Sequence, residues 1–190
     1  MCRDNSGVYP PTPTQTLRSK RDALVRSANW KRLLAALACA AAIALVLFAG
    51  VFAVGLVSGD SMHPSFQNRD IILFARPGGR GRHDAVILQA DSTRIHKYVK
   101  RVVGMPGDTV NIDENGVSIN GELLEEPYAA GFTQSGALHY PITLGQGEYF
   151  VLGDNRENSR DSRSFGIIKD DQIEGKVIAV LRTGKENGRR

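Results

Sequence analysis

The feature that most constrains this chain is a long uncharged segment near its amino terminus. From Leu33 to Val57 no charged residue occurs over 25 positions. As a helix at 1.5 Å per residue such a segment is about 37 Å long, and the hydrocarbon core of a bilayer is about 30 Å thick. A cleaved secretory signal has an apolar core of only about 7–15 residues, and a buried soluble helix shows polar residues at helical period. We therefore expect an uncleaved membrane-spanning helix over residues 33–57.

Charge is distributed unevenly on the two sides of this segment. Residues 1–32 carry seven basic and two acidic side chains, whereas the rest of the chain has a net charge of −1. Basic residues beside a span mark its cytoplasmic side. We expect residues 1–32 to form a cytoplasmic, disordered tail that contacts anionic lipid, and residues 58–190 to form an extracytoplasmic domain in a single-pass cell-membrane protein. Because that domain is not basic, nucleic-acid binding is disfavoured.

The outer domain must be stabilised by its core alone. The two cysteines, Cys2 and Cys39, lie in the tail and the span, so this domain can form neither a disulfide nor a thiolate metal site. The four histidines show no spacing typical of metal ligands: His63, His83, His96 and His139. We expect no metal and no cofactor.

The sequence beyond the span is typical of a β protein. Short apolar or alternating runs are separated by Gly, Pro, Asn and Asp, and they cover residues 70–74, 85–88, 94–103, 109–112, 117–119, 149–152 and 177–181. Two pairs, Asn115-Gly116 and Asn120-Gly121, predict tight hairpin turns in which both residues take positive φ. We expect a mainly β fold, one compact domain of mostly antiparallel coiled strands, with only short helices near residues 61–66 and 170–173.

A serine follows the span in the octapeptide Ser-Gly-Asp-Ser-Met-His-Pro-Ser, residues 58–65. Gly59 permits a tight turn, and Pro64 fixes the chain just beyond Ser61. The Ser61 hydroxyl can therefore be presented as a nucleophile, with its own N–H as half of an oxyanion hole. The alternative is an ordinary serine-rich turn or helix cap, and the octapeptide alone does not separate the two.

A lysine on an apolar strand offers a base for that serine. In the run Tyr-Val-Lys-Arg-Val-Val, period two places Lys100 on the same face as Tyr98 and Val102. A lysine with a pKa of about 10.4 cannot accept a proton at neutral pH, but burial can lower that pKa by roughly 3–5 units. The alternative is a surface lysine that protects an edge strand from aggregation.

A third polar stretch, Gly153 to Arg163, follows an apolar strand directly. Its density of donors and acceptors suits a loop that orients catalytic groups. For Arg156, Glu157 and Arg160 we expect only solvated charged side chains.

Together these stretches resemble the bacterial type I signal peptidases, which are membrane-anchored serine/lysine endopeptidases. Ser58 to Phe66 is similar to the nucleophile box of that family, and Arg94 to Asp108 is similar to its lysine box. Gly153 to Gly166 is similar to its Gly-Asp-Asn-x-x-x-Ser-x-Asp-Ser-Arg box. The resemblance extends from the anchor to about Val180.

The resemblance implies specific roles. Ser61 is then the nucleophile, and Lys100 is the general base and later the general acid. The supporting roles fall to a hydroxyl that holds the lysine amine, a nearby ion pair and two residues of the cleft floor, which are Ser159, Asp161 with Arg163, and Gly153 with Asp154. Position 59 is Gly where some members have a Ser that completes the oxyanion hole, so the second oxyanion donor is not assigned. The segment between the last two boxes is short, and the large accessory β domain of some members is expected to be absent.

The family removes signal peptides on the outer side of the membrane and requires small residues, often Ala, one and three positions before the cut. An extended substrate is expected to pair with the edge of the cleft. The candidate wall residues are Met62, Ile87, Leu88 and Tyr98. The expected partners are signal peptides and membrane lipid, and we expect a monomer.

Three alternatives stay open. Self-cleaving repressors of the SOS type share the Ser/Lys pair, but they are soluble and bind DNA, which the anchor and the charge of the outer domain disfavour. A specialised peptidase for pilin or conjugation substrates belongs to the same class of enzyme. A catalytically inactive, membrane-tethered peptide-binding module belongs to a different class.

Overall fold

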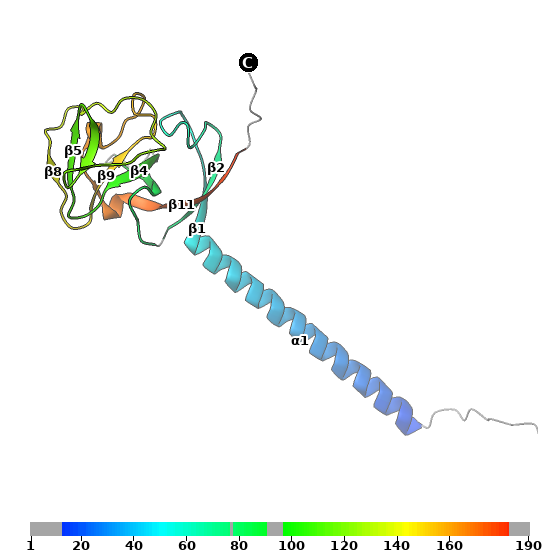
Figure 1. Ribbon diagram of the computed structural model, residues 1–190. Coiled ribbons are helices and arrows are strands. Elements are labelled where there is room, and N and C mark those ends of the chain that lie inside the picture. Colours follow the sequence, from blue (N-terminus) through cyan, green and yellow to red (C-terminus); the bar gives the residue numbers. More distant parts are fainter. Residues whose placement is uncertain (1–12, 77, 91–96, 183–190) are drawn as a thin grey trace, which may run out of the picture. The chain divides into compact units, whose positions relative to one another are not determined.

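The computed structural model describes residues 13–76, 78–90 and 97–182, and the chain divides into two compact units, residues 1–48 and 49–190. Helix α1 (Pro13–Val51) lies in the first unit as far as Phe48, and its last three residues belong to the second unit (Figure 1). Its segment Trp30–Val51, 22 residues, is long and apolar enough to cross a membrane, and its side chains are exposed. The sequence-based expectation of an apolar helix before a β domain is confirmed.

Both predicted boundaries of this helix are wrong. The helix already includes residues 13–32, which we expected to be disordered, and it ends at Val51 rather than at Val57. Residues 1–12 lie outside the described part of the chain. The end of the uncharged run forms strand β1 (Phe52–Leu56), which pairs with the next strand from Phe52 opposite Ala75 to Leu56 opposite Ile71. Absence of charge fits a sheet as well as a lipid core, so composition alone did not locate the change from helix to strand.

The second unit is built on two sheets in which all pairs of neighbouring strands are antiparallel. The larger sheet contains, in spatial order, β1, β2 (Ile71–Ala75), β11 (Ile173–Leu181), β3 (Ala85–Leu88), β4 (Tyr98–Gly104), β9 (Glu148–Leu152) and β10 (Ile168–Lys169). Strand β11 joins its two halves, because its end pairs with β2 and its beginning pairs with β3. The neighbouring strands β4 and β9 carry the lysine stretch and lead into the Gly153 stretch.

The smaller sheet contains, in spatial order, β7 (Glu122–Leu123), β6 (Gly116–Ile119), β5 (Thr109–Asp113) and β8 (Ile142–Thr143). In the turn between β6 and β7, both Asn120 (φ 55) and Gly121 (φ 88) take positive φ, as predicted. At the other Asn-Gly pair only Gly116 (φ 121) does so, because Asp113 pairs with Gly116 and the two turn residues are Glu114 and Asn115.

Both expected short helices can be compared with the structure. A 3₁₀ helix covers Asp170–Gln172, as expected. Residues 61–65 form turns rather than a helix. The structure also contains a four-residue helix that we did not predict, α2 (Ser162–Phe165). Its N-cap is Asp161, whose carboxylate accepts the Arg163 N–H.

The apolar core lies in three clusters. One joins the small sheet to β4 and β9 through Val103, Val110 and Phe150. A second, with Met62, Ile72 and Phe74, lies beneath β1 and β2, and a third, with Val86, Val102 and Val151, supports β3, β4 and β9. The strands that carry the lysine and precede the Gly153 stretch are therefore packed on both faces.

Candidate active site

Ser61 lies in the turn that leads out of β1. Gly59 takes a φ of 88°, and its N–H donates to Asn68 Oδ1 at 3.2 Å. The His63 N–H donates to the Asp60 carbonyl at 3.0 Å, and this bond closes the turn around Ser61. A left-handed φ of this kind strains residues that have a Cβ, and this explains why the octapeptide has Gly at position 59.

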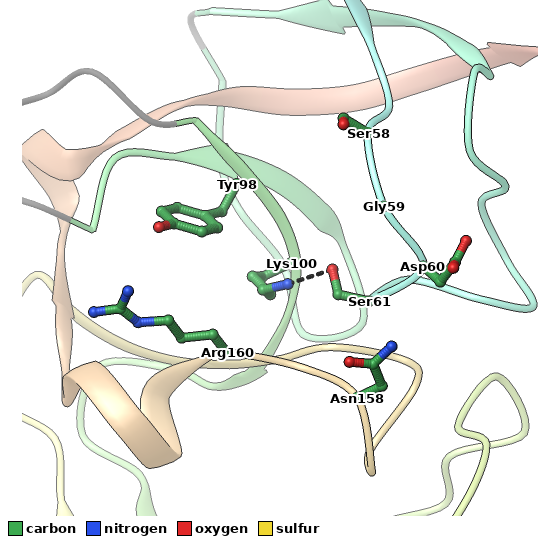
Figure 2. A pocket seen from close by; sticks show the side chains of 8 residues that line it. All are labelled: Ser58, Gly59, Asp60, Ser61, Tyr98, Lys100, Asn158 and Arg160. Atoms are coloured by element: carbon green, nitrogen blue, oxygen red, sulfur yellow. Dashed lines mark hydrogen bonds between the residues drawn. The ribbon is translucent and has the colours of Figure 1, made fainter.

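Lys100 meets this serine from β4. Its Nζ lies 2.6 Å from Ser61 Oγ, within hydrogen-bond distance (Figure 2). The whole lysine is only 1% exposed, and the Tyr98 ring lies 6.0 Å from Nζ. The sequence prediction that the lysine stretch brings Lys100 to the serine agrees with this geometry, and the alternative of a surface lysine does not.

Burial controls the charge of this lysine. Loss of water around the ammonium lowers the pKa of Lys100 from 10.5 to about 8. The carboxylates of Asp161 and Asp154 oppose this shift because they favour the ammonium, and the Arg163 guanidinium adds to it. A fraction of the molecules near neutral pH therefore carries a neutral amine that can accept a proton.

Asp161 and Arg163 form a buried ion pair next to the lysine. Arg163 donates from Nε to Oδ1 and from NH2 to Oδ2, both at 2.8 Å. Burial by itself would raise the pKa of Asp161, but the bonds from Arg163 and from the Gly153 N–H hold that pKa below its ordinary value. Asp161 is thus ionised at neutral pH and fixes the backbone of Gly153.

Gly153 lies where the Ser61 turn and Ser159 approach the end of β9 most closely. A Cβ on this residue would lie 2.1 Å from Ser159 Oγ and 2.5 Å from the Ser61 carbonyl. No larger residue fits this position without movement of the turn that carries Ser61.

The predicted bond between Ser159 and the lysine amine has no counterpart among the hydrogen bonds of the described residues. The Ser159 hydroxyl is buried and lacks a bond of normal geometry, although it is near enough to Asp161 to contribute to the low pKa of that group. The role of Ser159 therefore stays a prediction.

Asp154 is fully buried and binds Arg101, the neighbour of Lys100 on β4. Arg101 Nε donates to Asp154 Oδ1 at 2.7 Å, and Arg101 NH1 donates to the His83 carbonyl at 2.8 Å. This second ion pair connects the lysine strand with the Gly153 stretch. Our sequence analysis did not assign Arg101 a role, although its place beside the lysine was a usable signal.

The expectation that Arg156 is a solvated side chain is wrong. It is 3% exposed and donates from Nε to the Gly153 carbonyl at 2.9 Å and from NH1 to Thr133 Oγ1 at 2.8 Å. It also pairs through both NH groups with Glu126. Its partner comes from a segment that the motif does not include, and so the local sequence gave no signal of burial. Glu157 and Arg160 are exposed, as expected.

An open cavity of about 380 Å³ gives access to the Ser61–Lys100 pair. Its lining includes Tyr98 together with Asn158 and Arg160, which we had not assigned to the site (Figure 2). A smaller apolar cavity of about 160 Å³ shares Tyr98 and is also lined by Ile87, Val54 and Leu56.

The other two predicted wall residues, Met62 and Leu88, are 1% and 0% exposed, pack in the core and line neither cavity. Strand periodicity did not identify Leu88 as a core residue because β3 is buried on both faces, and Met62 lies in a turn, where periodicity gives no signal.

The burial of Lys100 should lower the free energy of unfolding of the protein. Since the folded protein binds the proton less tightly than the unfolded chain, protonated Lys100 destabilises the fold below pH 8, and this penalty disappears as the pH rises from about 8 to 10.5. We predict that Lys100→Met raises the free energy of unfolding by about 1–3 kcal/mol at pH 6. The advantage over the wild type should shrink above pH 8.

Denaturant unfolding of the full chain in detergent at several pH values measures this difference. The exposed Lys169 provides the control, because Lys169→Met should change stability by less than about 0.5 kcal/mol at every pH. A Lys100→Met variant less stable than the wild type at pH 6 would contradict the account.

Comparison with known proteins shows the family of this chain. The model of the family "Signal peptidase, peptidase S26" matches residues 30–182. Signal peptidase I S of Bacillus subtilis (strain 168) is 38% identical over 154 residues, with 74% of this chain and 82% of that protein covered. Signal peptidase IB of Staphylococcus aureus is 33% identical over 160 residues, with 73% and 83% covered.

A crystal structure of a signal peptidase I from Enterococcus faecalis V583 is 31% identical and covers 54% of this chain and 98% of its own, with a TM-score of 0.43. The matches along the sequence carry the assignment by themselves. They extend from the apolar helix through the serine, the lysine and the Gly153 stretch. The chain belongs to the signal peptidase family, peptidase S26.

Proposed function

We propose that Ser61 and Lys100 are the nucleophile and the general base with which this chain cleaves signal peptides. The class of activity follows from the family: the chain is a membrane serine peptidase that cleaves signal peptides. The observation that carries the residue assignment is the 2.6 Å contact between Lys100 Nζ and Ser61 Oγ. A lysine with a pKa lowered to about 8 supports the same assignment.

In the proposed mechanism the neutral amine of Lys100 accepts the proton of Ser61 Oγ as that oxygen attacks the scissile carbonyl. The resulting ammonium gives this proton to the leaving amine, which departs with the carboxyl-terminal product. Lys100, neutral again, then takes a proton from the water that attacks the acyl ester, and returns it to Ser61. The Ser61 N–H is proposed as one oxyanion donor.

The two cavities support a preference for small residues before the cut. An extended peptide alternates the direction of its side chains, so residues two apart face the same wall. Tyr98 borders both cavities, and the apolar cavity of about 160 Å³ also includes Ile87. We assign these two residues to the substrate wall and propose cleavage after Ala-x-Ala sequences.

The pair is tested by single and double replacement. Ser61→Ala and Lys100→Ala should each lower kcat by at least about 10³-fold, and the double variant should be no worse, because a nucleophile and its base act as a unit. Lys100→Arg should also fail, since a guanidinium stays protonated. The assay is cleavage of a preprotein and of a short Ala-x-Ala peptide, with the exposed Ser135→Ala as control.

The pH dependence gives a second check on the same variants. The rate of the wild type should rise with pH through an apparent pKa of about 8, as Lys100 loses its proton. Near-normal activity in Lys100→Ala, or loss of activity when one histidine is replaced, would refute the Ser/Lys assignment. An inactive wild type would favour the peptide-binding alternative.

We further propose that residues 58–190 face the outside of the cell and contact lipid through one face of the main sheet. Leu56, Ile71 and Leu181 are cross-strand partners on β1, β2 and β11, and they therefore lie on one face. Leu56 is 67% and Leu181 is 66% exposed. Arg76 and Arg182, which follow β2 and β11, are about half exposed and suit anionic headgroups.

Fluorescence quenching in liposomes tests this contact. A probe on Leu181→Cys, in a chain with Cys2→Ser and Cys39→Ser, should be quenched by lipids with a quencher in the acyl chain. A probe on Leu123→Cys, equally exposed but in the small sheet, should not be quenched. Equal quenching of both probes contradicts the proposed face, and protection of residues 58–190 from protease outside intact spheroplasts contradicts the orientation.

A further inference from the structure

The segment Glu126–Thr133, which we call the strap, lies against the loop that follows β9. Its residue Ala130 forms a parallel bridge with Asn155. The Ala130 N–H donates to the Asp154 carbonyl at 2.7 Å, and the Arg156 N–H donates to the Ala130 carbonyl at 2.8 Å. The strap therefore holds the backbone of this loop as a neighbouring strand would.

Side chains at both ends of the strap bind the same loop. Near the beginning, Glu126 accepts from Arg156 NH1 at 2.7 Å and from NH2 at 2.6 Å. At the end, Thr133 Oγ1 accepts from NH1 of the same arginine at 2.8 Å. The Arg156 side chain is 1% exposed and that of Glu126 is 9% exposed, so this pair is shielded from water, where such bonds are strongest.

The held loop reaches the nucleophile through one residue. The Asn155 N–H donates to the Ser61 carbonyl at 3.1 Å, and Asn155 Nδ2 donates to the Asp60 carbonyl at 3.2 Å. The turn that presents Ser61 is thus bound to a loop that the strap fixes.

The strap reaches the base by a second route. The Tyr128 ring lies 4.1 Å from the Arg101 guanidinium carbon, which is a cation–π contact. Arg101 is the residue that directly follows Lys100 on β4. The Tyr128 hydroxyl lies 2.8 Å from His83 Nδ1 and donates to Glu126 Oε1 at 3.2 Å. Tyr128 therefore confines the Arg101 side chain from one side while Asp154 binds it from the other.

From these two routes we propose that the strap sets the distance between Ser61 and Lys100, and that Tyr128 is a positioning residue acting through Arg101. This inference rests on the proposed function of the pair. No residue of the strap lines the cavity that opens onto Ser61 and Lys100, so its proposed role is to position the pair rather than to contact the reacting atoms. A displacement of about 1 Å in such a site can cost about 10²-fold in rate.

The position of Tyr128 decides which kinetic constant should change. Tyr128 lines neither the 380 Å³ cavity nor the 160 Å³ cavity, and we expect it to make no substrate contact. Loss of its ring should therefore lower kcat and leave KM nearly unchanged.

The test uses the full chain in detergent micelles and a short Ala-x-Ala peptide. Tyr128→Leu should lower kcat about tenfold or more with KM within about twofold. Tyr128→Phe keeps the ring over Arg101 and should retain kcat within about threefold. Phe132→Leu provides the matched control, because Phe132 is an aromatic residue of the same strap that is 52% exposed, and it should behave as the wild type.

Three outcomes would overturn the proposal. They are a kcat of Tyr128→Leu equal to that of the wild type, an increase in KM without a change in kcat, and an equal loss of kcat in Tyr128→Phe.

A second measurement does not depend on activity. Hydrogen exchange of the Asn155 and Arg156 amides should accelerate in Glu126→Gln and stay unchanged in the control variant Glu125→Gln at an exposed neighbouring position. Unchanged exchange of these two amides in Glu126→Gln would contradict the proposal that the strap fixes the loop. If instead Ser61→Ala cleaves like the wild type, the proposed function fails, whatever the exchange data show.

Discussion

The chemistry of the site depends on the burial of one lysine. An ammonium that loses its water is unfavourable, so Lys100 is tolerated only because the rest of the domain compensates for it. Apolar residues of β3, β4 and β9 pack around its strand, and two ion pairs, Asp161–Arg163 and Asp154–Arg101, lie beside it. Their carboxylates keep the pKa from falling further than about 8. The result is an amine that is both close to Ser61 and partly neutral at physiological pH.

Two buried charged side chains of the Gly153 stretch also hold the backbone of Gly153. Asp161 accepts from the Gly153 N–H, and the buried Arg156 donates to the Gly153 carbonyl. Because Gly153 has no side chain, both Ser159 and the Ser61 turn lie against it, and a Cβ at this position would be too close to both. Asp161 and Arg156, both buried, thus hold the Gly153 backbone near Ser61, whereas Glu157 and Arg160 are exposed.

Much of this arrangement could be predicted from local sequence. The strand runs, the Asn120-Gly121 turn and the meeting of Ser61 with Lys100 follow from period two, turn chemistry and three ordered motifs. The rest depends on residues far apart in the chain. The end of α1 at Val51 depends on pairing with β2, and the burial of Arg156 depends on Glu126, 30 residues earlier. No window around Val51 or Arg156 contains those partners, so composition favoured a longer helix and a solvated arginine.

The central claim is that Lys100 is largely neutral at moderately alkaline pH because the fold buries it beside Ser61. Its most direct test is an NMR titration of the full chain in detergent micelles, with lysine labelled at Cε and Nζ and the Lys100 signal assigned by comparison with Lys100→Met. The account predicts that this signal titrates with a pKa of about 8. A Lys100 signal that titrates near 10.5, like that of a free lysine, would contradict it.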